Sequence, residues 1–357
     1  TTGSSSSNNS GITSNNVIAG IYGNSIQNGT PTPTSPVEIE SVGEKTKNLF
    51  DKSAATLGKN LNASTGDLYN SQVRGVSDYI KIDPSKQYTF LYNSSVGTAS
   101  RYLVCYDENK NIISLPSCYN TVSGSPSTKR TLEFNSTTVK YIRANFLWNA
   151  DNSASEINDF MIYEGSNDEI YEPYGYKVPI TVSNGSDTKT TNIYLKEPLR
   201  KIGEYADYLD LTNKKVVRNV KEKVLSSSDR LSIAGRGIAF TENVDIIKPS
   251  STSTLPLVLC SHYNKSEWSY TMPTSGTKEG VSINSTVRLI GFYDSVNTTS
   301  LEKFKTFLDS NEVKLNYLLV TPTEESIDVP EIPSLTGNVT YTIGTSTKPS
   351  SINYTTR

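Results

Sequence analysis

The sequence predicts an all-β protein with two β-sandwich or jelly-roll-like domains, the second carrying one short helix, and with extended proline-rich terminal segments. Three observations support this prediction. Apolar and polar residues alternate along short runs, turn-forming residues separate the runs, and Ser, Thr and Asn crowd a chain whose hydrophobic content is only 35%. Many short strands with polar outer faces are typical of sandwiches. The length of 357 residues exceeds the usual size of one core, which predicts two domains.

The N-terminal segment is expected to lie outside the two domain cores. Residues 1–16 are nearly all Ser, Thr, Gly and Asn, which predicts a flexible tether because such residues bury too little surface to offset the cost of ordering. Residues 17–45 are predicted to be an extended spacer or an edge strand along the first domain, because the prolines within residues 30–36 favour extended backbone. Residue 1 is Thr rather than Met, so we expect a fragment of a longer chain or a trimmed one.

Residues 46–176 are predicted to form the first β-sandwich. Residues 102–106 are apolar on both faces and lead into a turn sequence at residues 107–110. The apolar positions that recur with period two are Ile80 and Ile82; Tyr88, Phe90 and Tyr92; Leu132 and Phe134; and Ile142, Ala144 and Phe146. Short strands at this spacing are typical of a sandwich or a jelly roll.

Residues 177–320 are predicted to form a second β-rich domain with a helix near residues 300–310. Thr299 and Glu302 have the spacing of a capping box. The apolar residues that share one face at helical spacing are Leu301, Phe304, Phe307 and Leu308. We therefore expect this helix to pack on a sheet. Residues 321–357 contain repeated prolines and are predicted to be an extended C-terminal segment that lies against a neighbour.

Several short motifs mark the ends of these domains. The first domain opens with Asn48-Leu49-Phe50-Asp51, and it closes with an apolar run at residues 157–165 and then Tyr171-Glu172-Pro173-Tyr174. Pro-Leu-Arg-Lys-Ile-Gly follows at residues 198–203, and Thr-Pro-Thr-Glu-Glu at residues 321–325. In these motifs the chain resembles modules in tail, baseplate and fibre (minor structural) proteins of phages that infect Gram-positive bacteria. The resemblance touches most of the chain.

The resemblance implies a structural protein of a phage virion, in a tail fibre, baseplate or appendage, with carbohydrate-binding-like β-sandwich modules that recognise a host cell-surface glycan. The implied ligand is a cell-wall polysaccharide or a teichoic acid. The implied partners are other virion proteins and copies of the chain itself, as a homotrimer. The location is then the virion, an extracellular particle assembled in the bacterial cytoplasm. Since Pro173 removes a donor from a strand ladder, the closing motif itself is interpreted as a domain boundary near Gly175 more than as a binding site.

Composition argues against nucleic-acid and membrane partners. Lys plus Arg number 34 and Asp plus Glu number 36, and both signs are dispersed, so no basic patch that could follow phosphates is expected. The longest apolar stretches, such as residues 255–260, are far shorter than the roughly 20 residues that span a bilayer. Cys105, Cys118 and Cys260 lack metal-ligand spacing, so we expect buried, reduced thiols.

Enzymatic activity is not expected. His262 is the only histidine, and its surroundings match no nucleophile motif. Glycosidase chemistry needs two carboxylates at a separation that the sequence does not give. Loop carboxylates that could serve are Asp67, Asp107, Glu108, Asp151 and Glu156. No cofactor is predicted, although Asp151, Asn152 and Glu156 offer oxygen ligands for a structural Ca²⁺ without the regular spacing of an EF-hand loop.

Two polar aromatic groups are the candidate contact surfaces for a glycan or a neighbouring subunit. Trp148 continues the apolar face of the last predicted strand and is expected to cap the core. The opposite face carries Tyr141, Arg143 and Asn145, an aromatic ring with hydrogen-bonding partners. The second group is an expected exposed loop after residue 260, which contains Tyr263, Trp268 and Tyr270.

Three other functions stay open at this point. The chain could be a purely architectural head, neck or tail decoration protein whose aromatic faces are subunit interfaces. It could be a glycan depolymerase, which requires two facing carboxylates in a groove. It could also be a bacterial surface adhesin built from similar sandwiches.

Overall fold

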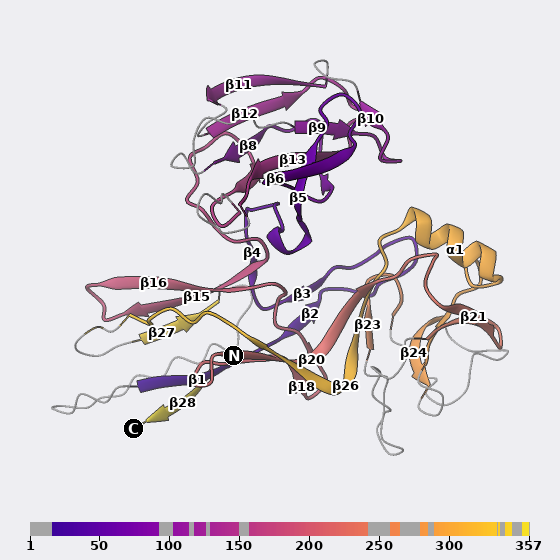
Figure 1. The fold of residues 1–357 in the computed structure, drawn as a ribbon. Coiled ribbons are helices and arrows are strands. Elements are labelled where there is room, and N and C mark those ends of the chain that lie inside the picture. The colour runs from indigo at the N-terminus through magenta and orange to yellow at the C-terminus, as the bar shows by residue number, and fades with distance from the viewer. Residues whose placement is uncertain are drawn as a thin grey trace. The chain divides into compact units, whose positions relative to one another are not determined.

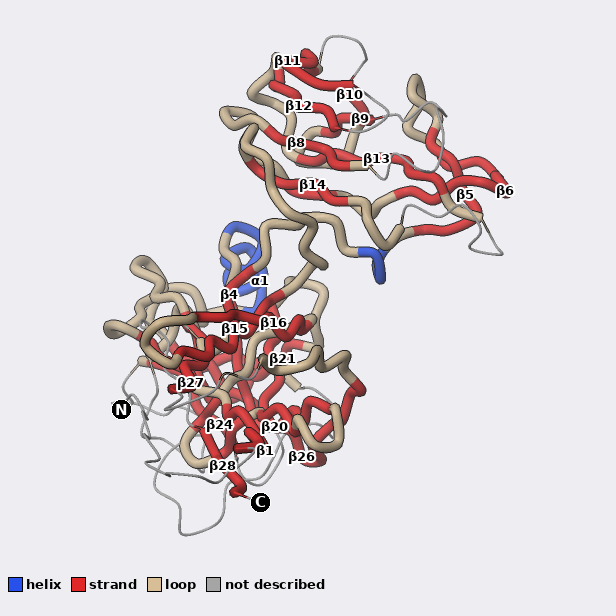
Figure 2. The backbone as a smooth tube through the Cα atoms, turned by 90° about the vertical axis from the view of Figure 1, so that its left-hand side faces the viewer, coloured by secondary structure: helices blue, strands red, loops and turns tan. Residues whose placement is uncertain are grey.

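The computed structural model describes residues 16–92, 103–113, 118–125, 129–149, 157–241, 258–264, 279–284, 289–333, 335, 340–344 and 352–356. The prediction of an all-β protein is confirmed: antiparallel sheets are the main structure of the described residues, and α1 (Leu301–Ser310) is the only α-helix among them (Figures 1 and 2). The chain divides into two compact units, residues 45–176 and residues 1–44 with 177–357. The expected boundary near Gly175 lies within two residues of this division.

The unit of residues 45–176 contains two antiparallel sheets. One has the strand order β10-β9-β13-β6-β5, with β7 also paired to β13, and the other has the order β11-β12-β8-β14. Its elements are η1 (Lys52–Ala54), β5 (Thr56–Leu61), β6 (Leu68–Val76), β7 (Ile80–Lys81), β8 (Tyr88–Leu91), β9 (Leu103–Tyr106), β10 (Ile112–Ile113), β11 (Tyr119–Ser125), β12 (Lys129–Phe134), β13 (Tyr141–Leu147) and β14 (Met161–Glu164).

The two sheets of this unit share one hydrophobic core, as in a β-sandwich. Phe90 and Ile162 come from one sheet, and Ile142 and Phe146 come from the other. Trp148 packs against the same core, which confirms its expected place. Period-two alternation therefore identified the core face of β13 correctly.

The other unit is built around a six-stranded sheet with the order β23-β26-β20-β19-β1-β28, beside smaller sheets. Its elements are β1 (Asn16–Tyr22), β2 (Ser25–Gln27), β3 (Ile39–Ser41), β4 (Glu44–Lys45, at the junction of the units), β15 (Tyr176–Ser183), β16 (Thr188–Leu195), β17 (Lys201–Ile202), β18 (Tyr205–Ala206), β19 (Tyr208–Asp210), β20 (Lys215–Val224), β21 (Leu231–Ala234), β22 (Gly237–Phe240), β23 (Val258–Cys260), β24 (Gly280–Asn284), β25 (Leu289–Tyr293), α1, β26 (Lys314–Ser326), β27 (Thr340–Ile343) and β28 (Ile352–Thr356).

The N-terminal segment differs from the expected spacer along the first domain. Strand β1 pairs with β19 on one side and with β28 on the other, so it lies inside the six-stranded sheet. The physical reason is the apolar side chain of Ile21, which is buried in a core with Leu209 and Val216. Beyond β1, Gln27 Nε2 donates to the carbonyl of Cys260 at 2.8 Å, which ties the segment to β23. The predicted tether falls almost wholly outside the described residues.

The C-terminal segment is also more structured than an extended tail. Residues 321–326 belong to β26, which pairs with β20, and β27 and β28 each join a sheet. Pro322 is tolerated because the register shifts between Arg218 and Val220 of the partner strand, and prolines within sheets occur at such bulges. Pro322 therefore interrupts the ladder locally without ending β26.

The expected helix is confirmed and packs on a second core of this unit. Phe304 and Leu308 are buried in that core with residues of β22 to β26, and Leu301 and Phe307 pack against it. The N-cap is Ser300, one residue later than the sequence suggested, and its Oγ accepts the N–H of Lys303 at 3.2 Å. Thr299 instead donates its hydroxyl to the Val296 carbonyl.

Two further expectations concern buried or apolar segments. The three cysteines are free and buried, as predicted. Within the described residues, no helix has the length and apolar character needed to cross a membrane.

Candidate functional site

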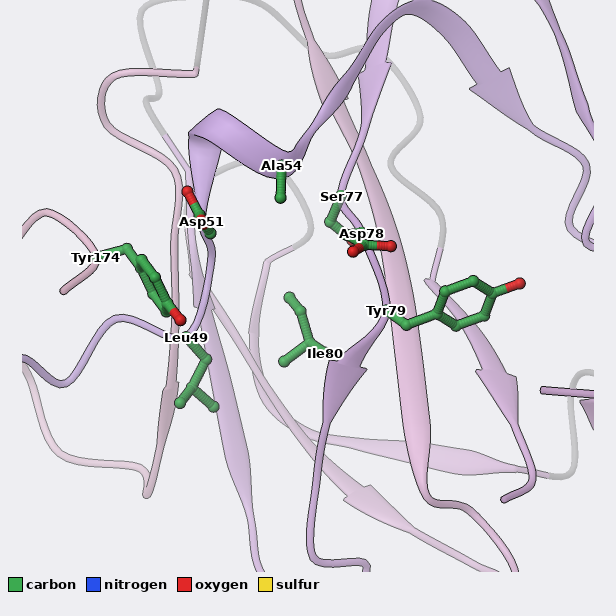
Figure 3. A pocket seen from close by; sticks show the side chains of 8 residues that line it. All are labelled: Leu49, Asp51, Ala54, Ser77, Asp78, Tyr79, Ile80 and Tyr174. Carbon is green, nitrogen blue, oxygen red and sulfur yellow. The ribbon is translucent and has the colours of Figure 1, made fainter. Parts of the chain in front are cut away.

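A recess of about 160 Å³ opens in the unit of residues 45–176, where the start and the end of the unit meet (Figure 3). Its lining residues are Leu49, Asp51, Ala54, Ser77, Asp78, Tyr79, Ile80 and Tyr174. Tyr174, Leu49 and Asp51 lie on one side of it and Ser77 to Tyr79 on the other, with Ile80 between them. The recess thus combines an apolar floor with two carboxylates and an aromatic ring.

The side chain of Asn48 brings the two ends of the unit together. Its Oδ1 accepts the N–H groups of Phe50 (2.9 Å) and Ile162 (3.2 Å), and its Nδ2 donates to the carbonyls of Phe160 (3.5 Å) and Glu172 (3.0 Å). An amide can make four hydrogen bonds, and all four are formed here. Asn48 therefore holds residues 49–51 next to the segment that carries Tyr174.

The carboxylate of Asp51 begins the short helix η1. Its Oδ1 accepts from the backbone N–H (2.8 Å) and the hydroxyl (2.7 Å) of Ser53. Its Oδ2 has no hydrogen-bond partner in the part of the chain that the structure describes. One oxygen thus fixes the side chain, and the other remains available to a ligand.

Tyr174 forms a wall of the recess and is 41% exposed. Partial burial raises the pKa of its phenol, and the negative charge of Asp51 raises that pKa further. The phenol hydroxyl is therefore protonated at neutral pH. The side chain offers both an apolar ring face and a polar hydroxyl group.

The opposite wall, Ser77 to Ile80, is held by β13. The backbone N–H of Ser77 donates to the Ala144 carbonyl at 2.9 Å, and its Oγ accepts the N–H of Ala144 at 2.9 Å. Asp78 is exposed and has no hydrogen bond or ion pair within the described residues. Its carboxylate is therefore free to meet a ligand.

The predicted contact residues Tyr141, Arg143 and Asn145 do share one face of β13, but that face is covered. Arg143 is 7% exposed and Asn145 is 0% exposed, so neither presents an open surface. The alternation of side chains along β13 indicated which residues share this face. It could not show that a second small core covers the face. That core contains Leu61, Val76, Val104 and Tyr106, with Tyr141 packed against it.

Arg143 supports the recess from behind. Its Nε donates to the carbonyl of Ser77 at 2.9 Å, and its guanidinium lies 4.9 Å from the ring centre of Tyr79. The ammonium of Lys110 lies 4.7 Å from the same ring centre. Tyr79 is thus held by two cations, each through a favourable contact with its ring.

The second predicted group is not an exposed loop where the structure describes it. Tyr263 is buried, and its hydroxyl donates to Asp294 Oδ2 at 2.6 Å. His262 is buried as well, with its ring against Phe307. This correction follows from the apolar environment beside α1. Trp268 and Tyr270 lie outside the described residues.

Among the described residues, the loop carboxylates considered for catalysis or Ca²⁺ binding do not form a catalytic pair or a metal site. Asp107 accepts hydrogen bonds from Asn109 and Asn111, and its bonds with Asn111 lower its pKa as in an ordinary turn. Within the described residues, no group of three or more His, Cys, Asp or Glu side chains could hold a metal ion. Asp151, Asn152 and Glu156 lie outside that part of the chain.

Sequence reasoning does not identify the lining of the recess as a site. Leu49, Asp51 and Tyr174 belong to the opening and closing motifs, and the closing motif is interpreted there as a domain boundary. The pairing of the two motifs was the available signal, because residues far apart in sequence that mark the two ends of a domain can meet in space. Comparison of the chain with protein-family models, with curated proteins and with solved structures finds no match in any of the three.

Proposed function

We propose that this chain is a structural protein of a phage virion and that its unit of residues 45–176 binds a glycan of the host cell surface. The motif resemblance supports the virion part of the proposal. The recess supports the binding part, because its lining combines the exposed ring of Tyr174 with the carboxylates of Asp51 on the same side and Asp78 on the opposite side.

These groups suit a sugar residue. An aromatic face packs against the apolar C–H face of a pyranose, and carboxylate oxygens accept hydrogen bonds from its hydroxyl groups. The recess, at about 160 Å³, is smaller than the roughly 300–1,000 Å³ of drug-sized ligand pockets. It therefore fits one residue of a polymer, and several copies in a particle would supply avidity that one weak site lacks.

Binding to host cell walls tests this proposal. The full chain, labelled with a fluorophore, is expected to bind purified host cell-wall polysaccharide, and Tyr174→Ala is expected to reduce that binding. A glycan array then identifies the sugar. Absence of binding to every wall fraction by the full chain contradicts the recognition part of the proposal.

The architectural alternative is favoured by one observation, the position of β28. This strand is the last one in the six-stranded sheet, and an edge strand can pair with another chain. A map of the assembled particle separates the two functions. Burial of β28 and of the recess between subunits favours architecture, whereas a recess open at the particle surface favours recognition.

The depolymerase alternative is also testable at the recess, since Asp51 and Asp78 are two carboxylates in one concave site. Such an enzyme would release reducing ends from host polysaccharide, and Asp78→Asn would abolish the release. Unchanged reducing-end content after prolonged incubation contradicts this alternative.

A further inference from the structure

We propose that the recess selects its sugar by charge: it accepts neutral and amino-bearing residues and disfavours phosphorylated or carboxylated ones. This inference rests on the proposed glycan recognition and narrows it. It removes phosphate-rich polymers such as teichoic acids from the expected ligands and favours neutral polysaccharides or polymers with free amino groups.

The two carboxylates of the recess are not neutralised by ion pairs. Asp51 interacts with the uncharged Ser53, and Asp78 has no ion pair among the described residues. An anionic sugar would have to approach both charges, whereas an ammonium group would be attracted by them. The two carboxylates therefore give the recess a negative electrostatic potential. Partial burial raises the pKa of the Tyr174 phenol, and the negative charge of Asp51 adds to that rise.

The cations near the recess in the described part of the chain have other contacts. The ammonium of Lys110 lies 4.7 Å from the ring centre of Tyr79, a ring that points away from Leu49 and Tyr174 (Figure 3). Lys47 forms an ion pair with Glu169 at 2.6 Å. Arg143 is buried behind Ser77, whose carbonyl accepts its Nε–H. A buried guanidinium behind the wall cannot form the bidentate contact by which arginines hold phosphate or carboxylate groups. The lining itself contains no Lys, Arg or His.

The expected size of the selectivity follows from the charge interaction. In water, one pair of unit charges at contact changes a dissociation constant by about fivefold. Glucosamine is therefore expected to bind about fivefold more tightly than glucose, and glucose 6-phosphate about fivefold more weakly. The three sugars share one ring, so the added group is the main difference between them.

Saturation-transfer NMR with the full chain measures this series, because the method detects weak monosaccharide binding. Glucosamine, glucose and glucose 6-phosphate are titrated at low and at high salt. The Asp78→Asn and Asp51→Asn variants should each make the affinities for the three sugars more similar. High salt should have the same effect. Glu108→Gln is the matched control: it removes an exposed carboxylate of the same unit that does not line the recess.

The outcomes separate this inference from the proposed function. Binding of all three sugars with equal affinity, or tightest binding of glucose 6-phosphate, overturns charge selection while leaving glycan recognition in place. A preference for glucosamine that persists in both Asp variants also overturns it. Absence of binding by any sugar, together with absence of binding to host polysaccharide, overturns both.

Discussion

The side-chain oxygen of Asn48 accepts the backbone N–H of Ile162 at 3.2 Å, which joins the first residues of the 45–176 unit to its last strand, β14. The same side chain donates to the Glu172 carbonyl at 3.0 Å. A single buried amide thus connects the opening motif with the closing one. Because the recess lies between residues that these two motifs supply, its shape depends on this connection.

Replacing Asn48 with Ala should destabilise the 45–176 unit by about 3 kcal/mol, because buried backbone groups lose their partners. Trp148 packs on the core of this unit and reports its unfolding by fluorescence once Trp268, the other tryptophan, is replaced by Phe. Urea titration in the Trp268→Phe background gives the free energy of unfolding.

Asn135→Ala is the control for this measurement. Asn135 is exposed, and its side chain bonds only to Asn120 among the described contacts, at 2.7 Å. Its loss should change the free energy of unfolding by less than about 0.5 kcal/mol. An Asn48→Ala effect as small as that of the control would show that the amide does not hold the two motifs together.

The unit of residues 1–44 and 177–357, which contains His262, should become less stable as the pH is lowered from 7 to 5.5. Burial lowers the pKa of His262, and Ser261 Oγ lies 2.8 Å from its Nδ1, where it can donate its hydrogen. A lowered folded pKa means that the unfolded chain binds the proton more tightly. Stability is therefore fully present above the unfolded pKa of about 6.5 and decreases as pH falls below it, by up to about 1 kcal/mol at pH 5.5.

His262→Gln isolates this effect because the sequence contains one histidine. Thermal unfolding is compared between the two proteins across this pH range, where no other side chain has its ordinary pKa. The variant should show a flatter pH profile, whatever its overall stability. The same pH dependence of stability in both proteins would contradict the assignment of the effect to His262.

Gly75→Ala should destabilise the 45–176 unit by about 2 kcal/mol. A Cβ at this position would meet Cζ of Phe146 at 2.5 Å and its Cε2 at 2.6 Å. Phe146 is fully buried and cannot move aside freely. Trp148 fluorescence in the Trp268→Phe background measures the loss.

A second substitution tests the cause of the Gly75 effect. Phe146→Leu shortens the side chain that the new methyl group would meet, so the double variant should lose less stability than the sum of the two single variants. If the two losses of stability simply add, the effect of Gly75→Ala does not come from the contact with Phe146.

The fold class could be predicted because β periodicity is a local property. Ile142, Ala144 and Phe146 alternate with polar residues, and the structure places all three in the core. Pairing between distant segments could not be predicted in the same way. Strand β1 lies beside β28, and the register of such a pair depends on contacts that no local pattern records.

The candidate site was harder to predict for a related reason. Alternation separated Arg143 from the core face of β13, but exposure depends on whether another layer covers that face. Tyr79 and Tyr106, whose ring centres lie 4.9 Å apart, are part of that layer. The sequence contained the needed signal in the paired motifs around Asn48 and Tyr174, although only the folded chain shows that they meet.

Tyr174→Ala should weaken binding of the host polysaccharide by about tenfold with little loss of stability. The ring supplies the apolar wall of the recess, and loss of one stacking contact of about 1.4 kcal/mol corresponds to that factor. Tyr174→Phe keeps the ring and should stay within about twofold of the original affinity. Tyr205→Ala is the matched control, because Tyr205 is similarly exposed, at 46% against 41% for Tyr174, but lies in the other unit. Equal losses in the two alanine variants would assign the contact to general surface adhesion instead of the recess.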